Sequence, residues 1–536
     1  MERAMAELRE PRHTLEELAE MGTRHLERVI GIDSQSDERS ETIPSTEGQR
    51  RLAEELERFF GGLGYATHRD ESANLLVDVP GNVEGAPKLA FMVHMDTARG
   101  TLAVDHLEVT PSWDGSRVPF PENDRLQVSI ERYPETKAFL GHDLLHGPGR
   151  LPIGLDDKLG MSEMMTLAQQ LAEDRELPHG DLVLVCRPDE EIGRMAAVEG
   201  LAQELARRGV THAYTLDGLA PFEVNVENFN ASRGIVRLVG TPLDLLPLPR
   251  ARIVRLRVTG AKSHGATAKA EGYLNATLVF ARAVAPLSRR SDLVPISFSS
   301  DLSAETDADI AFLALAEDEA GLERVEHALT KSFEDVLEPH RWKGADVAVT
   351  AREDADPAAT YTDEVVRLFV HLATFLRVAG PEPLLSEDSD GYQGYSNPYS
   401  VEHRPGELRL DYRFRDFSPE GLKAREEHVR RVVDETPGEV SLEVVQQYVN
   451  MGPALAPHKE LVAWAREAAA RCGEHIVEQP IRGGTGVDPF LAVGIPVANL
   501  GTGYFAPESE KELTSRQTIA RHARWIAHLV QVVAAR

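Results

Sequence analysis

Cysteine is scarce in this sequence: Cys186 and Cys472 are the only two in 536 residues. Two cysteines cannot form the disulfide framework that holds many secreted proteins together, which favours a reducing compartment. The sequence also has no apolar run of the ~18 residues that a membrane-spanning helix requires. Its N-terminal stretch is charged and lacks the apolar core of a secretory signal. We therefore expect a cytoplasmic protein with no membrane partner.

Basic residues are outnumbered as well. The chain contains 58 Lys and Arg against 87 Asp and Glu, which gives a formal net charge of −29. Nucleic acids and anionic membranes bind basic surfaces, so this balance argues against both as partners. The 41 Gly and 32 Pro fall well short of a low-complexity composition. The length is sufficient for about two to four domains.

Helical and strand patterns alternate over residues 1–220, as they do in an α/β domain. Three short apolar segments, 88–93, 181–186 and 212–216, are each followed directly by polar residues, and a fourth polar group opens a helix at 154–157. In an open α/β sheet, ligands bind beyond the carboxyl ends of the strands. We therefore expect these polar residues to converge on one crevice.

Residues 230–449 show a different pattern. The order helix, two strands, helix, strand occurs twice, which predicts two ferredoxin-like units in tandem. Residues 450–536 return to the α/β pattern. We therefore predict an α/β domain formed by 1–229 and 450–536, with an α+β domain inserted at 230–449.

The polar residues at these strand and helix ends are the candidates for chemistry: His94, Asp96, Asp156, Glu190, Glu191 and Asp217. Imidazole and carboxylate groups together suit Zn²⁺ and related divalent ions. One histidine with five carboxylates is too acidic for a single structural zinc and fits a pair of ions that share a bridging carboxylate. Such a pair lowers the pKa of a bound water and polarises a carbonyl group. The adjacent Glu190 and Glu191 suggest that one binds metal while the other moves a proton.

Each of these residues also has a plain structural interpretation. A histidine after a strand often serves packing, and an adjacent glutamate pair is usually solvated. Asp156 and its neighbour also fit the N-terminal cap of a helix. Only their joint placement favours a metal site.

Nine segments carry a family resemblance, and they occur in order along the chain: PSTEGQ at 44–49, HMDT at 94–97, GLDDKLG at 154–160, PDEEIG at 188–193, Asp217-Gly218 followed by ENFN at 227–230, SHGATAK at 263–269, RDF at 415–417, YVNM at 448–451 and PIRGGT at 480–485. In these segments the chain resembles peptidase T and its dipeptidase relatives, the co-catalytic di-zinc metallopeptidases of clan MH. The resemblance covers nearly the whole chain except roughly 290–390. There the extra unit looks like the doubled lid domain of some dipeptidases in the clan.

The resemblance implies a role for each of the metal-site residues. His94 and Asp217 would bind one metal ion, and Asp156 would bridge to a second ion that Glu191 also holds. Glu190 would be the general base, which takes a proton from the bridging water and passes it to the leaving amine. The implied cofactors are two divalent ions, zinc first, with manganese or cobalt as alternatives.

Four further residues receive roles from the same resemblance. Asp96 would hydrogen-bond the far nitrogen of His94 and fix its tautomer. His264, from the lid domain, would stabilise the oxyanion of the tetrahedral intermediate. Arg482 would bind a substrate carboxylate, and Asn450 is a further candidate substrate contact.

The sequence departs from the family in one metal ligand. Relatives carry a histidine in a His-x-x-Asp-Glu-like segment near the C-terminus, whereas residues 504–512 here contain none. Glu508 takes the ligand position in one alignment, and Glu510 takes it if the loop shifts. The alternative is a solvated loop and a weak or empty second metal site. Gly486 also stands where peptidase T has an acidic residue.

These observations predict a metal-dependent exopeptidase that hydrolyses short unblocked peptides, first of all a tripeptide aminopeptidase. A dipeptidase and an N-acyl amino-acid amidohydrolase of the same clan are alternatives. A non-catalytic metal- or peptide-binding protein with a degraded second metal site is a third. We expect a monomer or a homodimer, because a second lid unit can supply in one chain what a partner subunit supplies in relatives with a single unit.

Overall fold

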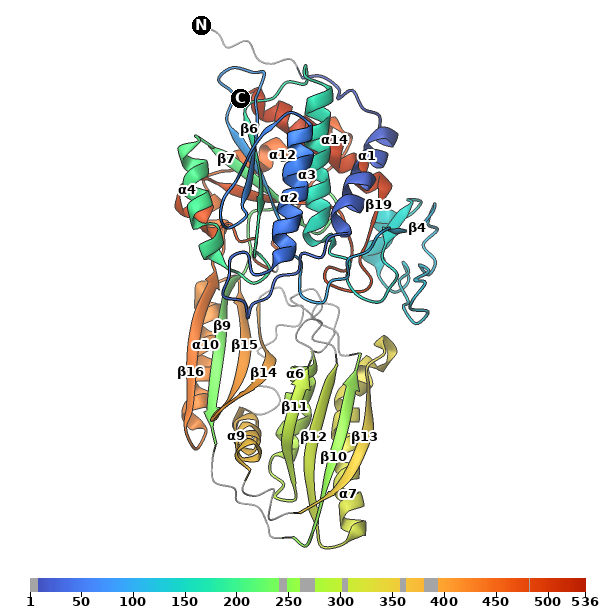
Figure 1. Ribbon diagram of the computed structural model, residues 1–536, viewed down its shortest axis with the longest axis vertical. Coiled ribbons are helices and arrows are strands. Elements are labelled where there is room, and N and C mark those ends of the chain that lie inside the picture. Colours follow the sequence, from blue (N-terminus) through green and yellow to red (C-terminus); the bar gives the residue numbers. More distant parts are fainter. Residues whose placement is uncertain are drawn as a thin grey trace. The chain divides into compact units, whose positions relative to one another are not determined.

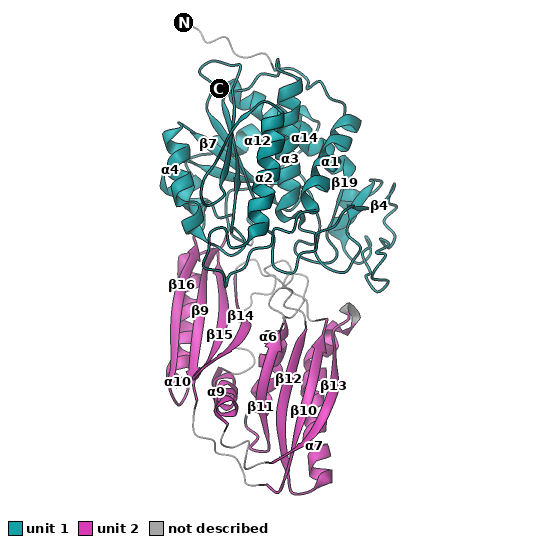
Figure 2. Cartoon of the chain, viewed as in Figure 1, with its two compact units in different colours: residues 1–228, 450–536 teal, residues 229–449 magenta. Residues whose placement is uncertain are grey.

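The computed structural model describes residues 8–240, 248–260, 275–300, 307–356, 363–379, 394–481 and 483–536. The chain divides into two compact units (Figure 2). Unit 1 consists of residues 1–228 and 450–536, and unit 2 consists of residues 229–449. Within the described ranges, every helix is too short or too polar to cross a lipid bilayer.

Unit 1 is built on an eight-stranded mixed sheet (Figure 1). In order across the sheet its strands are β1 (Ala66–Arg69), β2 (Leu75–Val79), β6 (Leu182–Arg187), β3 (Leu89–His94), β7 (His212–Gly218), β18 (Val497–Gly501), β8 (Glu223–Asn225) and β17 (Val477–Glu478). The central strands β6, β3, β7 and β18 run parallel to one another. Every residue of β3 and β6 is buried, as the continuous apolar runs in the sequence predict for central parallel strands.

Helices pack against this sheet and against one another. The helices of unit 1 are α1 (Leu15–Ile30), α2 (Glu47–Gly62), α3 (Leu155–Glu173), α4 (Glu199–Arg207), α11 (Gly452–Leu455), α12 (Glu460–Arg471), α13 (Asp488–Ala492) and α14 (Arg516–Ala534), with 3₁₀ turns η1 (Pro134–Phe139) and η2 (Met195–Ala197). Helix α3 packs on β3 and β7, and α1 and α14 pack on α3. Helix α1 begins at a capping box in which Thr14 and Glu17 satisfy each other's backbone N–H groups. A small antiparallel sheet of β19 (Leu513–Ser515), β5 (Leu144–His146) and β4 (Glu108–Thr110) completes the unit.

Unit 2 contains two four-stranded antiparallel sheets. The first has the order β11 (Leu293–Ser300), β12 (Ala308–Ala316), β10 (Arg250–Thr259), β13 (Asp346–Ala355), and the second has the order β14 (Gly394–Arg404), β15 (Glu407–Asp416), β9 (Asn230–Val239), β16 (Val440–Tyr448). The helices are α6 (Ala276–Leu287), α7 (Glu319–Leu337), α9 (Glu364–Ala379) and α10 (Pro419–Glu435), with the 3₁₀ turn η3 (Glu338–Lys343). Both sheets contribute to one apolar core, in which α9 packs against α6 and β11.

The two sheets of unit 2 have the same internal order, but the repeats are nested rather than consecutive. The chain forms β9, then the whole first sheet with α6 and α7, and only then α9 and the rest of the second sheet. This departs from the tandem order that we expected. The reason is that the second repeat takes its first strand from residues 230–239, well over a hundred residues before its second element, α9, and such a separation leaves no local signal.

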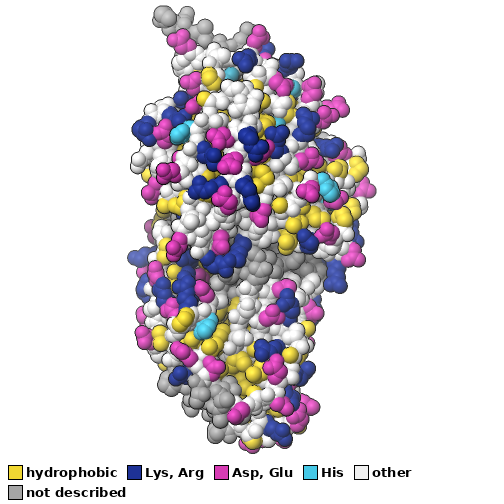
Figure 3. Space-filling view, in the orientation of Figure 1, with side chains coloured by type: hydrophobic (Ala, Val, Ile, Leu, Met, Phe, Trp, Pro, Cys, Tyr) yellow, Lys and Arg dark blue, Asp and Glu magenta, His cyan; other side chains and the backbone are white. Residues whose placement is uncertain are grey.

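Charged side chains of both signs are interspersed over the face of unit 1 that Figure 3 shows. On that face, Asp and Glu side chains are spread among Lys and Arg side chains rather than gathered in one area.

Candidate metal and active site

Three neighbouring parallel strands of unit 1 present the candidate residues at one edge of the sheet. His94 ends β3, Asp217 is the last residue but one of β7, and Glu190 and Glu191 follow β6. Because β6, β3 and β7 are parallel neighbours, their carboxyl ends meet at the same edge. Asp156 comes to this edge from the first turn of α3. The structure thus brings together the residues that the sequence singled out.

His94 lies at the centre of this group. Its Nε2 atom is 2.9 Å from Asp156 Oδ1 and 3.4 Å from Asp217 Oδ1. Its backbone N–H donates to Asp157 Oδ2 at 3.1 Å, which joins the end of β3 to the start of α3. Two overlapping groups of ligand atoms result, each within 4.8 Å: His94 with Asp157 and Asp217, and His94 with Asp156 and Glu191.

The carboxylates of this group are too crowded and too buried to carry their charges without a cation. Burial, together with the charge of Asp156, raises the pKa of Glu191 well above its ordinary value and that of Asp217 to about 7. Although burial opposes it, the Asp217 and Asp156 carboxylates raise the pKa of His94 well above 6.5. Among the described residues, Glu191 Oε1 is a buried oxygen with no hydrogen-bond partner. A carboxylate oxygen left unpaired beside this donor set fits a divalent cation.

Asp96 is fully buried and organises the two glutamates. Its Oδ1 accepts the backbone N–H of Glu190 at 2.9 Å, and its Oδ2 accepts that of Glu191 at 3.0 Å. The nearest oxygen to His94 Nδ1 is the backbone carbonyl of Asp96 at 2.9 Å, whereas the Asp96 carboxylate is 3.5 Å away. Because Nδ1 donates its proton to that carbonyl, Nε2 is the ring nitrogen that faces Asp156 and Asp217 and that can bind a cation once it has lost its own proton.

The PSTEGQ segment forms hydrogen bonds with the loop that carries Glu190. Asp189 is buried, with φ +56° in the left-handed region, and its carboxylate accepts the N–H of Ser45 at 2.9 Å and the amide of Gln49 at 2.8 Å. Gln49 in turn accepts the backbone N–H of Asp189 at 3.1 Å. These hydrogen bonds give the PSTEGQ motif a structural role: it fixes the position of Asp189, the residue directly before Glu190.

Arg187 is the buried cation beside Glu190. Its Nη2 lies 3.5 Å from Glu190 Oε1 and donates to the Thr485 carbonyl at 2.7 Å. Burial raises the pKa of Glu190, and Arg187 opposes that rise. A Cβ atom on Gly486 would lie 2.5 Å from Arg187 Nη1. A side chain at this position would therefore require the Arg187 guanidinium to move away from Gly486.

The sequence profile of peptidase family M20/M25/M40 matches residues 118–532, well over half of the chain. The chain belongs to this family. Peptidase T of Bacillus subtilis (strain 168) is 24% identical over 482 residues, covering 88% of this chain and 89% of that protein. The resemblance to peptidase T and the prediction that the chain is a peptidase are therefore confirmed.

Two solved structures are similar to this M20 peptidase along nearly its whole length. A tripeptidase from Staphylococcus aureus subsp. aureus mu50 has a TM-score of 0.51 and 16% identity, with coverage of 97% of this chain and 99% of that chain. Aminoacylhistidine dipeptidase from Vibrio alginolyticus has a TM-score of 0.53 and 14% identity, with coverage of 97% and 98%. These likenesses confirm the predicted fold class.

Sequence reasoning missed Tyr504 of this M20 peptidase. The Tyr504 hydroxyl donates to Asp156 Oδ2 at 3.1 Å, from a side chain that is 5% exposed. It therefore holds the carboxylate that belongs to a metal-ligand group and faces His94. The only signal in the sequence is its place directly after Gly501-Thr502-Gly503, at the end of β18.

Glu512 was also missed, and it fixes the segment that leads into Asp156. Its Oε2 accepts the backbone N–H groups of Ile153 and Gly154, both at 2.8 Å, and its Oε1 accepts the N–H of Glu508 at 2.8 Å. Burial raises the pKa of Glu512 to about 8. Gly154 itself has φ +78°, and a Cβ there would lie 2.7 Å from the Thr97 methyl group, so only glycine fits this turn.

The structure does not test the roles predicted for the remaining site residues. His264 and Arg482 lie outside the described residues. Neither metal-ligand group among the described residues around His94 includes Glu508 or Glu510, so their role as ligands stays a prediction. Asn450 accepts the Gly452 N–H at 2.7 Å, at the point where the chain returns to unit 1. This gives Asn450 a structural role, and its contact with substrate also stays a prediction.

Metal binding at this centre should release protons. The raised pKa values of His94, Asp217 and Glu191 mean that the metal-free centre holds protons at pH 7, and ligands must lose them to bind a cation. Affinity should therefore fall as the pH is lowered. Titration calorimetry with Zn²⁺ in buffers of different ionisation enthalpy should show at least one proton released per chain at pH 7. Binding without proton release would contradict this account of the centre.

Tyr504→Phe should weaken metal binding without loss of fold, because it removes only the hydroxyl that holds Asp156. Loss of a partner that orients a metal ligand typically costs ~10–100-fold in metal affinity. Tyr65→Phe is the matched control, since its hydroxyl donates to the Ala168 carbonyl at 2.9 Å and touches none of the candidate ligands. Metal titrations of both variants measure the difference. Equal affinities would show that Asp156 needs no support from Tyr504.

Proposed function

We propose that this chain is a metal-dependent exopeptidase that hydrolyses short unblocked peptides, and that its principal activity is that of a tripeptide aminopeptidase. The observation that carries the proposal is the Glu190–Glu191 pair beside His94, Asp156 and Asp217, in which one glutamate belongs to a metal-ligand group and the other does not. The likeness to Peptidase T of Bacillus subtilis and to the Staphylococcus tripeptidase supports the choice of substrate.

His94 and Asp217 would hold one divalent ion, and Asp156 would bridge to a second ion that Glu191 binds. Zinc suits this donor set best, with manganese or cobalt as alternatives. Such ions, when bound, lower the pKa of a coordinated water and polarise the carbonyl group of the peptide bond.

Glu190 would act as the general base. It accepts a proton from the attacking water and returns it to the leaving amine. Asp96 fixes the backbone of Glu190, and the buried Arg187 keeps its carboxylate partly neutralised. Burial raises the pKa of Glu190 toward the range in which a carboxylate is an effective base near neutral pH.

The remaining roles follow from the resemblance to the family. We assign residues 1–229 and 450–536 to the catalytic domain and residues 230–449 to a lid domain. His264 would stabilise the oxyanion, Arg482 would bind the C-terminal carboxylate of the peptide, and Asn450 would contact the substrate.

A dipeptidase is the second candidate activity. It is favoured by the likeness to the Vibrio aminoacylhistidine dipeptidase and by the nested second sheet of unit 2. The relative rates of hydrolysis of trialanine and dialanine separate these two activities, and an N-acetylated amino acid tests the amidohydrolase alternative.

Glu190→Gln should abolish most peptide hydrolysis while metal binding persists. The substitution keeps the shape of the side chain but removes the base, which typically costs ~10²–10⁴-fold in rate. Glu199→Gln, an exposed position at the start of α4, is the matched control. The assay is release of the N-terminal residue from trialanine by metal-stripped protein reloaded with Zn²⁺, Mn²⁺ or Co²⁺. Absence of hydrolysis by the wild type with every metal would overturn the proposed activity.

Glu508→Ala should reduce the number of metal ions bound at the catalytic centre by one, whereas Glu510→Ala should not. The backbone of Glu508 shares the Glu512 carboxylate with Ile153 and Gly154, which ties its loop to the segment before Asp156. Ion counts on the dialysed variants measure this. A lower ion count in Glu510→Ala but not in Glu508→Ala would show that Glu510 is the ligand. An unchanged ion count in both variants would show that neither glutamate replaces the missing histidine.

A further inference from the structure

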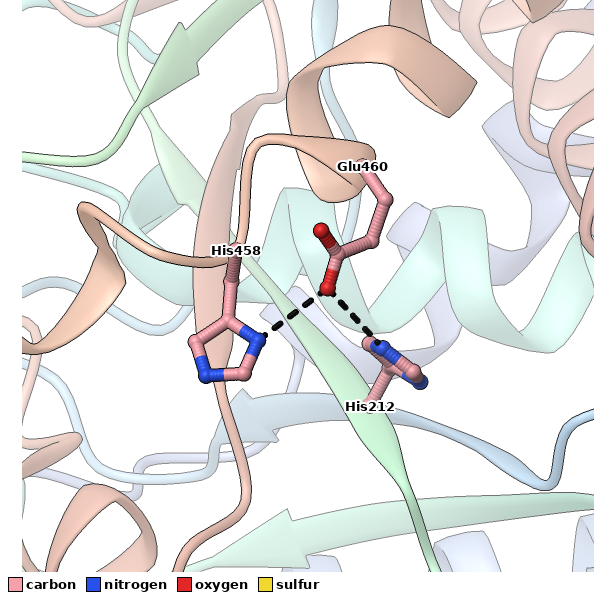
Figure 4. A group of neighbouring side chains, drawn as sticks. All are labelled: His212, His458 and Glu460. Atoms are coloured by element: carbon pink, nitrogen blue, oxygen red, sulfur yellow. Dashed lines mark hydrogen bonds and ion pairs between the residues drawn. The ribbon is translucent and has the colours of Figure 1, made fainter.

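A second cluster of metal-ligand side chains lies at the other end of β7. His212 is the first residue of that strand, Glu460 is the first residue of α12, and His458 precedes it by two positions. Figure 4 shows the three side chains turned toward one another. Glu460 Oε1 is 3.0 Å from His458 Nδ1 and 3.3 Å from His212 Nε2, and one donor atom from each residue falls within 4.8 Å of the others.

We propose that His212, His458 and Glu460 form a binding site for a divalent transition-metal ion, with Zn²⁺ as the preferred occupant, separate from the catalytic centre. Two imidazole nitrogens and one carboxylate oxygen are a donor set for zinc, with water completing the coordination. Mg²⁺ and Ca²⁺ prefer all-oxygen sites, so nitrogen donors select against them.

Contacts between protein groups hold these residues in place. The Tyr214 hydroxyl donates to the Leu461 carbonyl at 2.7 Å and joins β7 to the first turn of α12. The His212 ring packs edge-on against Trp464, with the ring centroids 4.8 Å apart. The backbone N–H of His458 donates to the Leu455 carbonyl at 2.8 Å, which fixes the turn that carries it. A rigid set of donors loses little freedom when it binds an ion.

The protonation state of His212 also suits a ligand. Its Nδ1 lies 3.0 Å from Thr211 Oγ1, a hydroxyl that can accept the Nδ1 proton, so that Nε2, which faces Glu460, is the nitrogen that would bind an ion. Burial lowers the pKa of His212, so the ring is neutral at pH 7 and competes little with the metal for protons.

The proposed site is independent of the catalytic centre. Asp217 lies five residues further along β7 than His212, which is roughly 17 Å at the usual rise of a strand. An ion here would join β7 to α12, two elements of unit 1 that are separated in sequence by the whole of unit 2. Binding to the folded state alone stabilises that state, so we infer a structural role for the ion.

The test is a count of bound ions in the full-length protein. Wild type and variants are stripped of metal, dialysed against buffered Zn²⁺ and analysed by mass spectrometry of the metal and by amino-acid analysis of the protein. The wild type should bind one ion per chain more than His212→Ala and one more than His458→Ala. His106→Ala is the matched control, because this exposed histidine faces a single carboxylate, Glu108, at 3.5 Å. Its count should equal that of the wild type.

Two further measurements keep the test decisive. Glu460→Gln should also bind one ion per chain fewer than the wild type. This variant provides the test if His212→Ala fails to fold because it loses the packing of His212 on Trp464. The rise in Tm that Zn²⁺ causes should be smaller in each of these variants than in His106→Ala. Equal ion counts and equal Tm shifts in the wild type and all three site variants would overturn the proposal. Because neither readout involves hydrolysis, the result does not depend on the proposed peptidase activity.

Discussion

Several carboxylates are buried around one imidazole at the edge of the unit 1 sheet where the strands end, and this crowding governs the candidate site. Carboxylates taken out of water near one another either bind protons or need a cation, because their mutual repulsion is large where the dielectric constant is low. In this chain Asp156, Asp217 and Glu191 meet at His94, and the pKa values of Asp217 and Glu191 are raised accordingly. The same feature makes the group a poor packing element and a good site for divalent ions.

The rest of the unit serves to hold these groups in place. The parallel strands β6, β3 and β7 bring their carboxyl ends to one edge. Buried carboxylates then accept backbone N–H groups of the loops: Asp96 holds the glutamate pair, and Asp189 and Glu512 hold the neighbouring segments. Several hydrogen bonds to one buried carboxyl group hold the backbone of a loop in one conformation. Asp96 thereby fixes the backbone of both Glu190 and Glu191.

The sequence predicts the parts of this arrangement that have a local signal. The apolar runs that are followed by His94, by the Glu190–Glu191 pair and by Asp217 predict where three strands end. The likeness to the solved structures confirms the fold class. Tyr504 and Glu512 have no such signal, because their partners lie some 350 residues earlier in the chain. The nested order of unit 2 escaped prediction for a similar reason, since β9 pairs with strands far from it in sequence. The contact of Arg187 with Gly486 could not be predicted either, because the two residues are about 300 positions apart in the sequence.

The most direct test of the central claim is anomalous diffraction from crystals of the full chain equilibrated with Zn²⁺, recorded on both sides of the zinc absorption edge. Our account predicts a zinc peak among His94, Asp156 and Asp217, and a second peak beside Asp156 and Glu191. Crystals that show no zinc at His94 under saturating conditions would contradict the claim that these buried carboxylates are organised around divalent cations.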